Sequence, residues 1–352
     1  MTKERIIYAD VLRIIATFAM IVLHVSSNRW YLSWNGFEWN VLTLYDSCVR
    51  WCVPVFFMIS GMTFLNPSVD ITYQKLFTKY IPRIIVALFF WGITYNLYKD
   101  IDKLNIHYIH TTLFILFNIL AKNILGPPWY HLWFLYAIVG LYLITPMIRI
   151  FIKQATEKDI RYVLILFFIF GSLTNLLNYF LPYKISFVVP EFHNYIGYFI
   201  AGYYFSTYDV NKNIRVIFYL LAICSVALTF YATYVMSHKL GKPESFFYDN
   251  ILPTTMIIAY AVFLFVKNCK FNAANIRASF LKNNYIIHLS NYCFGIYLIH
   301  DFGIKLLVYL NINSDTINPI VSVPLNSILV FIAALGIVYC IKKIPVLKDW
   351  IV

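Results

Sequence analysis

Long apolar stretches separated by short polar segments run through the chain. Ten of these stretches are long and apolar enough to be predicted as membrane-spanning helices, although the sixth is short. They are residues 6–27, 45–66, 79–98, 131–152, 161–181, 194–208, 214–236, 250–267, 285–308 and 321–341. The piece 107–122 is a further amphipathic candidate that could lie in the membrane interface. The pattern predicts an all-α, polytopic integral membrane protein that forms one transmembrane domain over residues 1–352.

The lysines and arginines are distributed unevenly between the segments that join these stretches. With the N-terminus in the cytoplasm, the inner segments hold 18 of them and the outer segments 7. Cytoplasmic loops of membrane proteins are enriched in Lys and Arg, so this bias predicts that both termini are cytoplasmic. The net charge of +12 therefore reports topology and does not indicate a nucleic-acid partner.

Composition agrees with a membrane location. Hydrophobic residues make up 61% of the chain and charged residues only 12%, roughly half the share in soluble domains. The six cysteines form no metal-type cluster, so no metal is expected. The first apolar stretch is too long and too charged in its middle to be a cleavable signal peptide.

The first predicted helix carries three ionisable side chains, Asp10, Arg13 and His24. Ionisable groups within a membrane are costly and almost always face a protein interior or a watery cavity, which makes them candidates for function. Arg13 and His24 lie within about 20° of each other on one helix face and roughly 16 Å apart along the axis. Asp10 shares this face. The helix is therefore predicted to line a path from the inner to the outer side.

Other polar groups divide in the same way between the two sides of the membrane. The inner side gathers Lys79 and Arg83 with Asp10 and Arg13, which predicts a basic mouth suited to phosphates. The outer halves hold His24, the i,i+4 pair Asp46 and Arg50, the group Trp129, His131 and Trp133, and the group Tyr297 and His300. We predict an outer pocket rich in imidazole, with a substrate held by these outer residues.

Each of these groups also has a purely structural interpretation. An isolated intramembrane histidine often only makes a hydrogen bond between helices. Asp46 and Arg50 are as suited to locking two helices as to touching a substrate. Lys79 and Arg83 could mark topology or bind anionic lipid. Tryptophans such as those near residue 130 are typical of interfacial aromatic belts.

Five segments in order resemble the membrane acyltransferase family 3. They are YADVLRIIATFAMIVLH, VPVFFMISGMTFL, YHLWFLYAIVGLYLITP, NYIGYFIAGYYFS and CFGIYLIHDFGI, and together they cover nearly the whole chain. The resemblance is closest to the branch of surface-polysaccharide O-acyltransferases, which includes an O-acetyltransferase of the enterobacterial common antigen.

The resemblance implies a ten-helix enzyme that transfers an acyl group, usually acetyl from acetyl-CoA, to a hydroxyl of a cell-envelope glycan. His24 matches the family's catalytic histidine and Arg13 its partner arginine. Many members carry an Arg-x-x-Arg pair on the inner side between the second and third spans. Here Lys79 and Arg83 stand at a spacing one residue longer, which puts in question their joint role on the CoA phosphates.

The expected reaction needs a base, for which His24 is the best candidate, and a grip on an anionic donor. We expect Arg13, Lys79 and Arg83, with Asp10 beside them, to bind acyl-CoA from the cytoplasm. Tyr297 or His300 is the candidate to orient the base. The expected partners are acyl-CoA, a glycan or lipid-linked saccharide acceptor, and the lipids of a bacterial cytoplasmic membrane. The alternative from a different class is a transporter or flippase for lipid-linked or small anionic substrates.

Overall fold

The protein is built from α-helices. The computed structural model describes residues 5–100, 109–185, 195–269, 285–345 and 347–352. Over these ranges it has no strand, and nine helical segments have the length and apolarity to cross a membrane. The predicted all-α, multi-pass membrane fold is therefore confirmed. The cytoplasmic placement of both termini stays a prediction.

The helices group into two compact units, and each unit is described by itself. The first unit comprises Met1–Val69 and Phe151–Gly336, and the second Asp70–Ile150 and Ile337–Val352. The prediction of one transmembrane domain over the whole chain stays a prediction.

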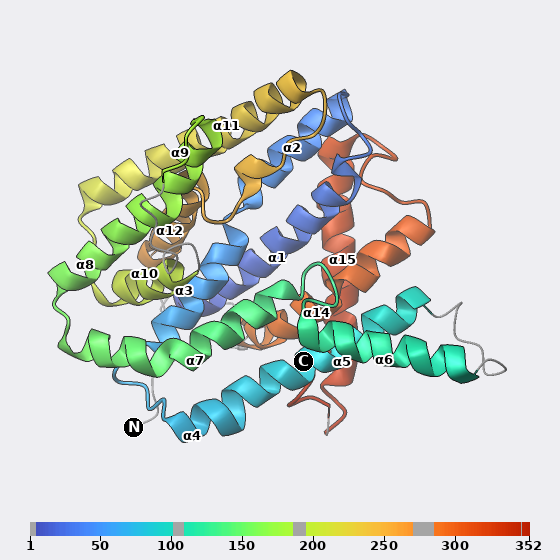
Figure 1. The fold of residues 1–352 in the computed structure, drawn as a ribbon, viewed down its shortest axis with the longest axis horizontal. Coiled ribbons are helices and arrows are strands. Elements are labelled where there is room, and N and C mark those ends of the chain that lie inside the picture. The colour runs from blue at the N-terminus through green and yellow to red at the C-terminus, as the bar shows by residue number, and fades with distance from the viewer. Residues whose placement is uncertain (1–4, 101–108, 186–194, 270–284, 346) are drawn as a thin grey trace. The chain divides into compact units, whose positions relative to one another are not determined.

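The first unit holds most of the helices labelled in Figure 1. They are α1 (Ile7–Trp30), α2 (Phe37–Val49), α3 (Cys52–Phe64), α8 (Glu157–Leu166), the π-helical segment η3 (Phe167–Leu173), α9 (Thr174–Phe180), α10 (Ile196–Thr207), α11 (Lys212–Leu240), the 3-10 turn η5 (Phe246–Tyr248), α12 (Pro253–Asn268), α14 (Tyr285–Tyr309) and most of α15 (Pro319–Ile341). The second unit contains α4 (Tyr73–Lys75), the π-helical segment η1 (Leu76–Tyr80), α5 (Ile81–Asp100), α6 (Ile109–Leu125) and most of α7 (Trp133–Gln154).

Helix α1 is surrounded by other helices of the first unit. Its 24 residues give a length of about 36 Å, enough to cross the hydrocarbon core of a bilayer. It packs against α2, α3, α12 and α14 (Figure 1). Protein covers most of its surface, and of its ionisable side chains Asp10 is fully buried.

The second predicted span is two helices with a break between them. Helix α2 ends at Val49 and α3 begins at Cys52. Pro54 explains the break, because its nitrogen has no hydrogen to donate to the carbonyl of Arg50 and its ring clashes with that carbonyl. The Trp51 indole caps the interrupted helix by donating to the Cys48 carbonyl at 2.8 Å. Arg50 is thus fixed at the break, in the middle of the segment.

The sixth predicted span, 194–208, is shorter than a bilayer. It contains α10, whose 12 residues measure about 18 Å, and it is not among the nine segments long enough to cross. Helix α10 is instead buried against α3. A Cβ on Gly61 would lie 1.7 Å from the Phe199 carbonyl oxygen, and one on Gly202 would lie 1.9 Å from that of Met58. Glycine at these two positions therefore lets the two backbones touch.

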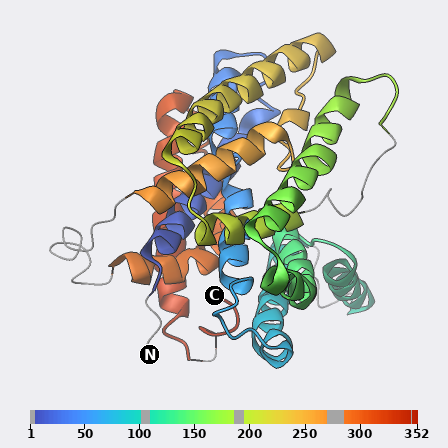
Figure 2. The same ribbon diagram turned by 90° about the vertical axis from the view of Figure 1, so that its left-hand side faces the viewer.

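Helix α11 lies along α12 at the edge of the first unit, where Figure 2 shows them as the yellow-to-gold and the orange helix. Its buried residues are all polar and four apart: Ser225, Thr229, Thr233 and Ser237. Its exposed residues are mainly large and apolar, including Ile223 and Tyr231. This reversal of the usual helix pattern is expected where the outer face meets lipid and the polar groups turn toward protein.

The amphipathic piece predicted at 107–122 corresponds to α6 of the second unit. Residues 107 and 108 lie outside the described residues, and the helix runs from Ile109 to Leu125. With 17 residues it is not among the segments that are long enough to cross a membrane.

Candidate functional site

Two histidines from different helices meet inside the first unit. His24 of α1 and His300 of α14 stack, with ring centroids 5.1 Å apart and planes 27° from parallel. His300 is fully buried, whereas His24 keeps part of its surface exposed. The two side chains lie far apart in the sequence and are brought together by the packing of α1 on α14.

A backbone contact fixes the tautomer of His300. Its Nδ1 lies 2.7 Å from the carbonyl oxygen of Tyr297, one helical turn earlier. A carbonyl oxygen only accepts, so Nδ1 carries the hydrogen and Nε2 is the accepting nitrogen of the neutral ring. The Tyr297 ring is nearly parallel to that of His300 at 6.4 Å. His300, one of the two predicted orienting partners, therefore has its ring directly against that of His24.

Asp46 and Arg50 form the predicted ion pair, beside the break between α2 and α3. The Arg50 guanidinium donates through Nη2 to Asp46 Oδ2, and the Asp46 side chain is buried. The guanidinium carbon of Arg50 lies 4.2 Å from the ring centroid of Tyr248, in the η5 turn. The charge of Arg50 is also within electrostatic reach of the His24 ring. Four helical segments thus converge on one buried polar cluster.

Tyr248 is a member of this cluster that sequence reasoning missed. It lies in a short turn between α11 and α12, and its hydroxyl donates to the Thr43 carbonyl at 3.4 Å. Trp30 packs edge-on against it at 5.4 Å. Nothing in the segment SFFY distinguishes this tyrosine from its aromatic neighbours, so its contact with Arg50 required the structure.

At the other end of α1, Asp10 is enclosed by hydrogen-bond donors. It accepts from Arg5 Nε at 2.7 Å, from Arg13 Nη1 at 2.9 Å and from Ser290 Oγ at 2.7 Å. Arg5, which precedes the helix, also donates to Asn291 at 2.9 Å. Its hydrogen bond to Asp10 raises the pKa of Arg5. The network ties α1 to α14, and neither Arg5 nor Ser290 was a predicted site residue.

Asp10 and Arg13 differ in how many of their hydrogen-bonding atoms already have a partner. Asp10 is fully buried and accepts hydrogen bonds from all three partners, and its part in binding CoA stays a prediction. The Arg13 side chain is 34% exposed and uses one nitrogen on Asp10. Since a guanidinium has five N–H donors, Arg13 keeps donors for a ligand.

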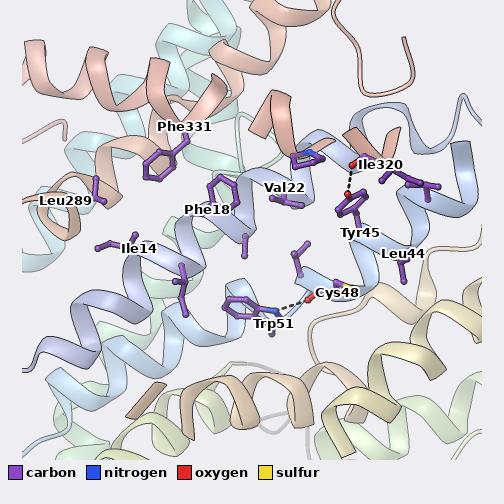
Figure 3. A pocket seen from close by; sticks show the side chains of 15 residues that line it. Ile14, Phe18, Val22, Leu44, Tyr45, Cys48, Trp51, Leu289, Ile320 and Phe331 are labelled. Carbon is purple, nitrogen blue, oxygen red and sulfur yellow. Dashed lines mark hydrogen bonds between the residues drawn. The ribbon is translucent and has the colours of Figure 1, made fainter. Parts of the chain in front are cut away.

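A cavity of about 930 Å³ lies on the opposite face of α1. Ile14, Phe18 and Val22 of α1 line it, together with residues of α2 and α15 such as Tyr45 and Phe331 (Figure 3). The Tyr45 hydroxyl is engaged by the Ile320 carbonyl at 2.8 Å. Among the described residues, no ionisable side chain other than Tyr45 and Cys48 lines this cavity, so its lining is almost entirely apolar.

The remaining predicted outer residues form a separate group in the second unit. Trp129 stacks on Tyr95 with centroids 5.0 Å apart, and His131 meets the same ring edge-on at 5.2 Å. His131 is 2% exposed. Trp133 contacts Phe134 edge-on at 6.4 Å. These residues were predicted as substrate contacts together with those near His24, and that grouping stays a prediction.

Lys79 and Arg83 also belong to the second unit. Both side chains are exposed, and four residues separate them on a continuous helical stretch, so they share a face. Lys79 Nζ lies 5.9 Å from the Tyr80 ring centroid. Arg83 Nη2 donates to the Val352 carbonyl at 2.9 Å. The spacing one residue longer than Arg-x-x-Arg thus still places both cations on one side.

Comparison with known families gives the cluster a chemical context. A family model described as an acyltransferase domain matches residues 6–343. The chain belongs to the acyltransferase 3 family. The match covers segments of both units, including those that carry His24, Arg50 and His300. Neither a curated protein nor a solved structure matches the chain.

This member of the acyltransferase 3 family is a membrane acyltransferase. Acyl transfer to an alcohol needs a base that removes the hydroxyl proton and donors that stabilise the oxyanion. The cluster offers imidazole from His24 and His300 and a guanidinium from Arg50, all sheltered inside the first unit.

Proposed function

We propose that this acyltransferase moves an acyl group, with acetyl the expected one, from cytoplasmic acyl-CoA to a hydroxyl of a cell-envelope or secreted glycan. The transfer takes place at the outer side of a bacterial cytoplasmic membrane. The observation that carries this proposal is that His24 and His300 stack beside Arg50, on helical segments long enough to span the membrane.

In the proposed reaction His24 accepts the proton of the acceptor hydroxyl. The hydroxyl oxygen attacks the thioester carbonyl, and the resulting oxyanion is stabilised by N–H donors of the cluster. The C–S bond then breaks, the ester forms, and the CoA thiolate takes up the proton held by His24. One ester and one free thiol are produced for each thioester consumed, and His24 returns to its neutral form.

The donor is proposed to bind at the opposite end of α1. Arg13 keeps N–H donors beyond the one engaged by Asp10. CoA carries several phosphates, so charge-assisted hydrogen bonds from Arg13 would hold one of them. The separation of roughly 16 Å between Arg13 and His24 along the helix leaves room for an extended pantetheine arm.

Release of free thiol from acetyl-CoA tests the proposal. Purified protein in lipid nanodiscs is incubated with acetyl-CoA and a mixture of methyl glycosides, and thiol and ester are measured together. We expect both products from the wild type and neither from His24→Ala. His288→Ala is the matched control, since His288 lies on α14 like His300 but is exposed. A transporter would release no thiol, and equal release by His24→Ala and wild type would refute the assignment of His24.

A further inference from the structure

The ion pair between Asp46 and Arg50 is incomplete in a specific way. Only Arg50 Nη2 and Asp46 Oδ2 are joined. The other carboxylate oxygen, Asp46 Oδ1, and the Arg50 Nε are both buried, and neither has a hydrogen-bond partner among the described residues. A side-by-side arrangement of the same two groups would have satisfied all four atoms. The pair therefore leaves one acceptor and one donor unused.

Buried polar atoms without a hydrogen-bond partner cost free energy of folding. The Asp46 side chain is 1% exposed and that of Arg50 16%. Leaving a buried donor or acceptor unpaired costs a substantial part of its hydration free energy, so native structures seldom do so without a reason. Here two such atoms of opposite character lie within one ion pair, next to the stacked histidines.

The position of Arg50 is imposed by its surroundings. It lies at the break that Pro54 causes between α2 and α3, and the face of the Tyr248 ring supports its guanidinium at 4.2 Å. Tyr248 is itself held by Thr43 and packed against Trp30. The guanidinium is thus anchored by two fixed elements, while its Nε stays unused.

Few chemical groups satisfy both atoms at once. An anion would pair with Arg50 Nε and be repelled by Asp46, and a cation would do the reverse. A hydroxyl group donates through its hydrogen and accepts through its oxygen, so a single hydroxyl can bond to Asp46 Oδ1 and to Arg50 Nε together. A hydroxyl is also the group that the proposed reaction brings to this site.

We propose that Asp46 Oδ1 and Arg50 Nε hold a second hydroxyl of the acceptor, adjacent to the one that is acylated. The enzyme then selects acceptors with two neighbouring hydroxyl groups, as a pyranose ring provides. One hydroxyl is anchored by the ion pair, and its neighbour is presented to His24. This inference rests on the proposed function, because it describes how the same site recognises its acceptor.

Two small alcohols serve as probes. Wild-type protein in nanodiscs is given acetyl-CoA with either 1,2-propanediol or 1-propanol, and the acetate ester at the primary hydroxyl is measured. We expect the diol to be esterified about tenfold faster, since two additional hydrogen bonds form at the ion pair. The ratio of the two rates is the readout, so a general loss of activity in a variant does not imitate the result.

Substitution of either member of the ion pair should remove the preference for the diol. In Asp46→Asn the carboxylate is lost, and in Arg50→Lys the charge remains but no N–H stands at the position of Nε. We expect the diol preference to fall to about twofold or less in both variants, because each one loses a charge-assisted hydrogen bond that distinguishes the diol. Glu157→Gln, which removes an exposed i,i+4 pair with Arg161 far along the chain, should keep the wild-type ratio.

The outcomes separate this inference from the proposed function. Ester formation with an unchanged diol preference in Asp46→Asn and Arg50→Lys would overturn the inference alone. If the wild type releases thiol but forms no ester with either alcohol, the inference alone is overturned. The same holds if the wild type esterifies both alcohols at equal rates. Absence of His24-dependent thiol release in the wild type would overturn the proposed function and the inference with it.

Discussion

His24 and His300 stack ring on ring, with centroids 5.1 Å apart, and the Tyr297 carbonyl fixes which nitrogen of His300 carries the hydrogen. This contact ties the candidate base to the helix that also holds Ser290, the partner of Asp10. The two ends of α1 are therefore both positioned by α14, one through stacked imidazoles and the other through a buried carboxylate.

Replacing His300 by phenylalanine separates its polar role from its packing. Phenylalanine keeps a flat ring of similar size against His24 but has no nitrogen. We expect His300→Phe to remain folded and to lose acyl transfer at least tenfold, since a positioned polar partner contributes on roughly this scale. Thiol release from acetyl-CoA measures the loss, and His288→Phe on the same helix is the control. Full activity of His300→Phe would mean that only the ring stacking matters.

The sequence predicted the parts of this site that lie within one helix and failed where separate segments meet. Asp46 and Arg50 were found because four residues on one helix place them together. The contact of His24 with His300 depends on how α1 packs on α14, which periodicity does not specify. Tyr248 was missed because it lies in a loop turn and has no distinguishing pattern.

The span boundaries show a similar division. Long apolar stretches predicted the nine helical segments of the described residues that are long and apolar enough to cross a membrane, since length and hydropathy define such segments. The break before α3 was overlooked because the apolar run continues through Pro54. Helix α10, which corresponds to the short sixth stretch, packs its apolar residues against α3, and hydropathy alone does not distinguish such burial in protein from exposure to lipid.

The close approach of α3 and α10 predicts strong sensitivity at its glycines. A methyl group on Gly61 or Gly202 would overlap the opposite backbone, which side-chain movement cannot relieve. We expect Gly61→Ala and Gly202→Ala each to destabilise the protein by at least the roughly 1–3 kcal/mol typical of overpacking. Thermal unfolding of purified protein in detergent measures this. Gly140→Ala is the matched control, because a Cβ at Gly140 meets nothing within 4 Å. Equal melting temperatures for all three variants would contradict the backbone contact between α3 and α10.

The network around Asp10 predicts a structural defect when its charge is removed. In Asp10→Asn the buried site loses the carboxylate that pairs with Arg5 and Arg13 and accepts from Ser290. Breaking a buried ion pair costs about 3–5 kcal/mol, and the partial exposure of both arginines reduces this toward the lower end. A clear fall in melting temperature is therefore expected. Asp209→Asn, which removes an ion pair with Lys267 at a carboxylate 93% exposed, should change it little. Unaltered stability of Asp10→Asn would instead favour a direct role in ligand binding.

Arg13 is expected to act on the donor rather than on the acceptor. Its side chain is partly exposed and has unused donors, at the end of α1 away from His24. Arg13→Ala should raise the KM for acetyl-CoA by roughly 10-fold or more, the scale of a hydrogen bond to a charged group. Arg13→Lys should restore part of this affinity because the charge is kept. Initial rates at varied acetyl-CoA and fixed acceptor provide the measurement, and a change confined to the acceptor KM would refute this placement.

Lys79 and Arg83 allow the donor role to be distinguished from a purely topological one. Both cations are exposed on one face in the second unit, where either CoA phosphates or anionic lipid could bind. If they bind CoA, the double variant Lys79→Ala, Arg83→Ala should raise the KM for acetyl-CoA while the protein keeps its orientation in the membrane. Lys75→Ala is the control, because Lys75 is an exposed cation of the same segment that pairs with Asp70. Cysteine accessibility from each side of the membrane reports orientation in the same samples. An inverted or mixed orientation with an unchanged KM would show that these residues serve topology alone.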